Sequence, residues 1–87
     1  MKVIVELPDY DPNHGIQYNW ERGFTIAVSA EGKEIFLDAN KAGLVSLANH
    51  LLFLAQNSVP FGSHMHLDDS NSLESGSSIL TITKKDL

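Results

Sequence analysis

The side chains best suited to metal binding, proton transfer or recognition are those of His64, His66 and Asp68. They alternate with Met65 and Leu67. In an extended strand, successive side chains point to opposite faces. The two imidazoles and the carboxylate would then line one face, while the two apolar side chains would point to the core. Such a face could hold a metal ion, recognise a partner or be the solvated side of a sheet.

A metal site is the first alternative, because imidazole and carboxylate ligands suit zinc, nickel, copper and non-haem iron. His64, His66 and Asp68 would be the ligands of a small metal-binding protein or metalloenzyme. A fourth ligand would have to come from His14 or His50, and the helical pattern places His50 on an outward face. The chain has no cysteine. We therefore keep metal binding as an alternative and expect no cofactor.

Acid–base catalysis is the second alternative, since a histidine beside Asp68 could act as an oriented base. The chain lacks an activated-nucleophile motif, a phosphate-binding glycine loop and a dinucleotide fingerprint. A chain of 87 residues also has little room for a deep substrate pocket. The sequence predicts a protein that is not an enzyme.

The connection from Asp9 to Gly23 is long and carries Tyr18 and Trp20. Long connections are often functional, and tyrosine and tryptophan are typical interface anchors. The structural alternative is that these two aromatic residues extend the next strand or cover the edge of the core. Acidic residues around them would suit a basic protein partner.

The charge balance limits the possible partners. Six basic and eleven acidic residues give a net charge of −5, which argues against nucleic-acid binding. The longest apolar run, Leu51 to Ala55, is far shorter than the about 20 residues of a membrane span. The N-terminus has no signal-peptide core. Together with the absence of cysteine, these features predict a cytoplasmic protein that binds another protein.

The elements that would position these residues follow from hydrophobic periodicity. Asn40 is a plausible helix N-cap. The expected order is β-β-β-α-β-β in a single domain, 1–87. This is an α+β two-layer sandwich of five mostly antiparallel strands with one helix on one face. The expected strands are 2–7, 24–30, 33–37, 63–68 and 79–83, and the expected helix is 41–57.

The helical pattern also predicts which side of the helix meets the sheet. Leucines and alanines recur at spacings of three and four and should face the strands. His50 and Phe53 fall on the opposite, outward side, whereas Gly43 should allow a close approach in the first turn. The face with His64 and His66 would then be free of the helix and open to water, a partner or a second copy. The predicted buried stripe comprises Leu44, Leu47, Ala48, Leu51, Leu54 and Ala55.

Two motifs connect the C-terminal half of the chain to a known family. Asn40, Gly43 and Leu44 form an N-x-x-G-L helix start, and residues 62–68 form a G-x-H-x-H-L-D strand. This combination resembles a small bacterial immunity-protein family of polymorphic toxin systems. The resemblance runs from Asn40 to the end, about half the chain, and the N-terminal half carries no matching motif. It implies a cytoplasmic antidote that binds and blocks a cognate toxin domain without enzymatic activity.

The leading hypothesis is therefore an immunity-type binding protein that covers a basic toxin surface. We expect the partner-binding residues to lie on the histidine-bearing strand and in the aromatic connection. A homodimer through the open sheet face is a further possibility. The expected partner-binding residues are His64, His66, Asp68, Asp69, Tyr18 and Trp20.

Overall fold

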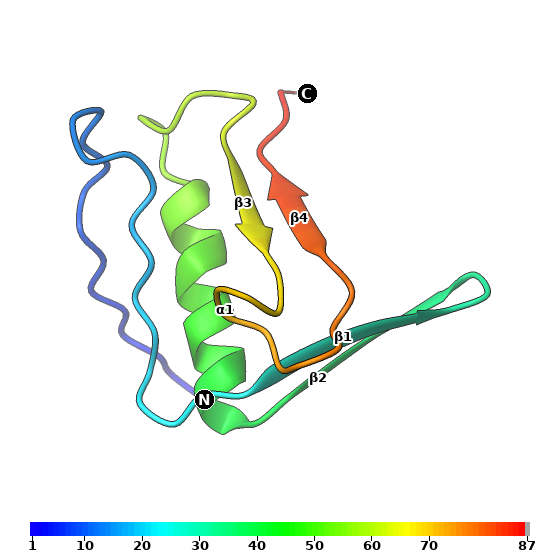
Figure 1. The fold of residues 1–87 in the computed structure, drawn as a ribbon. Coiled ribbons are helices and arrows are strands. Elements are labelled where there is room, and N and C mark those ends of the chain that lie inside the picture. Colours follow the sequence, from blue (N-terminus) through cyan, green and yellow to red (C-terminus); the bar gives the residue numbers. More distant parts are fainter. Residues whose placement is uncertain (87) are drawn as a thin grey trace.

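Two antiparallel strand pairs and one helix make up the part of the fold that the structure describes (Figure 1). The computed structural model describes residues 1–86. β1 and β2 form a hairpin, whereas β3 and β4 are joined by the longer loop 68–79 and pair beside the helix. The elements are β1 (Ile26–Glu31), β2 (Glu34–Ala39), α1 (Lys41–Leu54), β3 (His64–Leu67) and β4 (Leu80–Thr83).

The prediction of an α+β fold is confirmed, but its details differ from the structure. The four strands form two separate sheets in the order β-β-α-β-β, instead of five strands in one sheet. The helix ends at Leu54 and not at Asn57, because the chain turns at Ala55 and Gln56. Within residues 1–86, no helix is long and apolar enough to cross a bilayer.

The predicted first strand, 2–7, is not a strand in the structure. Its side chains alternate as in a strand, but none of the described strands pairs with it. The segment that follows is held by Gln56 instead. The Gln56 side chain accepts a hydrogen bond from the Tyr10 amide at 3.0 Å and donates one to the Pro8 carbonyl at 3.1 Å.

The start of α1 is tied closely to the segment that enters β1. Asn40 is the predicted N-cap, and its Oδ1 accepts hydrogen bonds from the amides of Gly43 and Thr25. Its Nδ2 donates to the Gly23 carbonyl at 2.9 Å. A Cβ on Gly43 would lie 2.3 Å from the Thr25 oxygen and 2.9 Å from Ile26 Cγ1. The prediction that Gly43 permits a close approach is therefore confirmed.

The rotation of α1 about its axis is the main departure from the sequence analysis. Its buried residues include Ser46, Asn49, His50 and Phe53, which were expected to face outward. The exposed residues include most of the predicted core stripe, with Leu44 54% and Leu51 44% exposed.

The physical reason for this rotation is the irregular segment that covers the polar side of the helix. An irregular backbone needs hydrogen-bond acceptors when it is covered. Ser46 Oγ accepts from the Glu21 amide at 2.7 Å, and His50 Nε2 accepts from the Asn19 amide at 3.0 Å. An all-leucine face could not supply these acceptors.

Two adjoining clusters form the core. One gathers Ile26 and Val28 of β1 with Leu67 and Leu73, and the other gathers Leu54, Val59 and Met65. The tip of the β1–β2 hairpin extends beyond this core (Figure 1). Ile35, near this tip in β2, is therefore 72% exposed.

Candidate functional site

The strand predicted to carry the functional residues has the expected alternation. His64 and His66 of β3 are exposed, whereas Met65 and Leu67 are almost completely buried. In β4, Thr83 lies opposite His64 and Thr81 lies opposite His66. We call His64, His66, Thr81 and Thr83 the histidine face; it lies on the side of the β3–β4 pair away from the core.

The polar groups of the histidine face interact with one another only in part. Thr81 Oγ1 lies 3.2 Å from His66 Nδ1, and Asp68 Oδ2 lies 3.8 Å from His66 Nε2. The His64 ring instead contacts the backbone two residues earlier, with Nδ1 3.3 Å from the Gly62 carbonyl oxygen. His64 therefore remains open to the outside and is available for contact.

Asp68 has a structural role that the sequence analysis did not assign. Its Oδ1 accepts hydrogen bonds from the Ser70 hydroxyl and amide and from the Asn71 amide. The hydrogen bonds from the Ser70 hydroxyl and amide lower the pKa of Asp68. Hydrogen bonding by aspartate to amides two and three residues ahead is typical of Asx turns. The Asp-x-Ser-Asn order of residues 68–71 is the signal that would have found it.

Asp69 also contributes to the loop after β3. Its Oδ2 accepts a hydrogen bond from the Gly76 amide at 3.2 Å. Within the described residues, no group of three histidine, aspartate or glutamate side chains could hold a metal ion. The geometry thus gives no support to the metal alternative with His64, His66 and Asp68 as ligands.

Tyr18 and Trp20 belong to an aromatic cluster beside α1. Trp20 stacks on Phe24 with ring centroids 4.4 Å apart and meets the edge of His50 at 4.3 Å. Tyr18 is parallel to Trp20 at 6.1 Å and contacts His50 at 5.4 Å. Trp20 is only partly exposed, whereas Tyr18 is 43% exposed. Of the two predicted anchors, Tyr18 is thus the more accessible.

His50 is buried at the centre of this cluster, so the prediction that it faces outward is wrong. The prediction that Phe53 is exposed is wrong for the same reason, since both side chains are at most 2% exposed. The Asn19 amide donates to His50 Nε2, which must be unprotonated to accept. Burial lowers the pKa of His50. The neutral ring therefore carries its proton on Nδ1, a buried atom that has no hydrogen-bond partner among residues 1–86.

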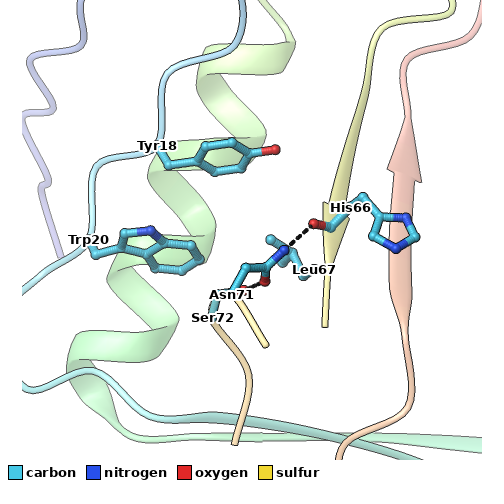
Figure 2. Close-up of a pocket in the computed structure, with 6 residues that line it drawn as sticks. All are labelled: Tyr18, Trp20, His66, Leu67, Asn71 and Ser72. Atoms are coloured by element: carbon cyan, nitrogen blue, oxygen red, sulfur yellow. Dashed lines mark hydrogen bonds between the residues drawn. The ribbon is translucent and has the colours of Figure 1, made fainter. Parts of the chain in front are cut away.

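A small pocket of about 100 Å³ lies between the aromatic cluster and the end of β3. Figure 2 shows Tyr18 and Trp20 on one side and Asn71 on the other. The His66 ring points away from this pocket toward β4, and only its backbone reaches the lining. There the Asn71 side-chain amide donates to the His66 carbonyl at 3.0 Å.

The predicted site residues therefore lie in two groups and not on one surface. His64 and His66 are on the histidine face, with Asp68 and Asp69 engaged in the adjoining loop. Tyr18 and Trp20 are beside α1, on the core side of β3. A partner that contacts both groups would have to reach around the end of β3.

Comparisons with known proteins give one match. The family model described as Immunity protein 32 matches residues 34–85, which include β2, α1, β3 and β4. No curated protein and no solved structure matches the chain. The matched region contains both the helix-start motif at Asn40 and the histidine strand, and it covers more than half of the chain.

Proposed function

Because the chain belongs to the Immunity protein 32 family, we propose that it neutralises a cognate bacterial toxin by binding the toxin directly. The observation that carries this proposal is the family match across residues 34–85. An inhibitor of this kind performs no chemistry, so its activity depends on a surface that complements the toxin. Steric coverage of the toxin's functional region is the simplest mechanism.

We propose the histidine face as the main contact surface. His64 and His66 belong to the motif that ties the chain to the family, yet their side chains are exposed and outside the core. Met65 and Leu67 account for the packing of the same strand. Exposed polar residues beside a rigid strand pair can contact a partner without any cost in core packing.

The charge of the chain supports a basic partner surface. A net charge of −5 would accelerate the approach of a positively charged toxin through long-range attraction. Asp68, whose pKa is lowered by the hydrogen bonds from Ser70, lies at the edge of the histidine face and adds a negative charge there. Tyr18, with its ring partly exposed, is the second proposed anchor, and Trp20 supports it by parallel stacking.

The test requires the toxin domain encoded next to this gene, co-expressed with the chain in bacteria. Wild type should protect the cells and bind the purified toxin domain. His64→Ala combined with His66→Ala should weaken binding by about tenfold or more, since loss of two central contacts typically costs more than 1 kcal/mol. Ser29→Ala, on the distant β1–β2 hairpin, is the matched surface control.

Circular dichroism should show the same fold for all three proteins, because none of these side chains is buried. If the double variant binds and protects as well as wild type, the histidine face is not the contact surface. If wild type neither binds the toxin domain nor protects the cells, direct neutralisation itself is refuted.

A further inference from the structure

Within residues 1–86, no helix or strand covers the outward side of α1, which is an apolar surface. Leu44, Val45, Ala48, Leu51 and Leu52 form this surface, which we call the apolar helix face. Their exposure is the direct result of the rotation that buries the polar side of α1. Isolated exposed leucines are ordinary, but a contiguous set on one helix face marks an interaction surface.

The N-terminal segment extends this surface. Between it and α1 is a groove of about 530 Å³ whose lining includes Val3, Val5, Leu44, Ala48 and Leu52. Val3 and Ile4 are themselves 62% and 93% exposed. Apolar side chains on both sides of the groove would be covered by an apolar partner.

The total surface of the chain is large for a monomer. A compact monomer of 9.6 kDa exposes about 5,100 Å² by the usual scaling with mass. The chain exposes 6380 Å², an excess of about 1,300 Å², while each partner of a standard interface buries about 800 Å². The chain alone therefore exposes more surface than a compact monomer of its mass, and the excess is larger than one side of a standard interface.

Charge distinguishes between possible occupants of the apolar helix face. Between Asp38 and Asp68 the sequence contains no aspartate or glutamate, and Lys41 is the one charged residue of α1. This face offers nothing to attract a basic toxin. The apolar helix face complements an uncharged apolar surface. The apolar helix face of a second copy is such a surface.

We propose that two copies of this chain form a symmetric dimer through antiparallel packing of their α1 helices. A twofold axis near Ala48 would place Leu44 of each copy beside Leu52 of the other. The two Lys41 side chains would lie at opposite ends, so like charges do not meet. A self-complementary patch of this kind is what a twofold interface requires. The histidine face lies on another side of the molecule and stays free in the dimer.

The first test is the molar mass of the purified chain, measured by light scattering over a range of concentrations. We expect a dimer that dissociates only on strong dilution. Leu52→Glu should convert it into a monomer, because a carboxylate would be buried against the second copy. Ile79→Glu is the matched control, since Ile79 is 63% exposed and lies outside this face. The Ile79→Glu variant should remain dimeric.

A strictly monomeric wild type overturns the proposal. A Leu52→Glu variant that remains dimeric overturns it as well, because the interface would then lie elsewhere. Circular dichroism of both variants should match wild type, since the substituted side chains are exposed. The Leu52→Glu monomer should still protect cells from the toxin, so loss of dimerisation and failure of the proposed function are separate results.

A second test uses the absence of cysteine in the chain. Ala48→Cys should form a disulfide-linked dimer under mild oxidation, because the twofold axis brings this position close to its counterpart. Thr83→Cys, on the histidine face, should remain largely unlinked. Equal linking of the two variants, or linking of Thr83→Cys alone, would overturn the antiparallel helix pairing.

Discussion

Gly43→Ala tests the close approach between α1 and β1, and two effects of opposite sign compete at this position. In an unconstrained helix, replacing glycine by alanine stabilises by up to about 1 kcal/mol. Here the new Cβ would lie 2.3 Å from the Thr25 carbonyl oxygen and 2.9 Å from Ile26 Cγ1. The first of these atoms is backbone and cannot move by changing a rotamer.

The steric effect should dominate. Overpacking of this kind typically costs about 1–3 kcal/mol. Moving Thr25 away would also strain its hydrogen bond from the Asn40 amide, 3.2 Å long, and such a bond contributes about 1 kcal/mol. After subtraction of the gain in helix propensity, we expect Gly43→Ala to lower the free energy of unfolding by about 1–3 kcal/mol.

Urea unfolding followed by circular dichroism measures this change as a lower midpoint at an unchanged slope. Ala42→Gly, one position earlier in the same turn, is the matched control and should cost up to about 1 kcal/mol. Both variants should thus be destabilised, although one exchanges glycine for alanine and the other does the reverse. A Gly43→Ala midpoint equal to or above wild type would refute the proposed contact between α1 and β1.

Three further predictions follow from the local contacts. Because burial lowers the folded-state pKa of His50, the free energy of unfolding should be constant above neutral pH and fall as the pH drops below about 6.5. Urea midpoints measured against pH should show this fall in wild type and a smaller fall in His50→Gln. An equal fall in both would exclude His50 as its cause. Asn40→Ala should lower the free energy of unfolding by about 2 kcal/mol. Asn40→Asp should lower it less, because aspartate keeps both accepted hydrogen bonds and loses only the one donated to Gly23. Equal losses in calorimetry would contradict the capping role. Asp68→Ala should accelerate amide hydrogen exchange at Ser70, and an unchanged rate would show that the turn is held by other contacts.

Features set by neighbouring residues were predictable from the sequence. The alternation of His64 to Leu67 is inherent in an extended backbone, and the structure reproduces it. Asn40 could be identified as an N-cap because capping involves residues within one helical turn. The motifs around Asn40 and in the histidine strand also indicated an immunity-protein family, and the family match confirms this.

Features that depend on distant segments could not be predicted in this way. The apolar pattern at residues 2–7 satisfies the local requirement for a strand, but a strand also needs a pairing partner, and none of the described strands pairs with this segment. Tyr18 and Trp20 could be recognised as possible anchors. Their packing against His50, a residue far away in the sequence, appeared only in the structure.

The rotation of α1 shows most clearly where sequence reasoning ends. By itself, the sequence determined that a helix forms after Asn40, that β3 alternates, and that the leucines of the helix gather on one side. It did not determine which side would be buried. The tertiary structure decided this, because an irregular segment needed Ser46 and His50 as acceptors for its amides while Gly43 and Asn40 fixed the helix against β1. These constraints outweigh the burial of several leucines, which remain exposed.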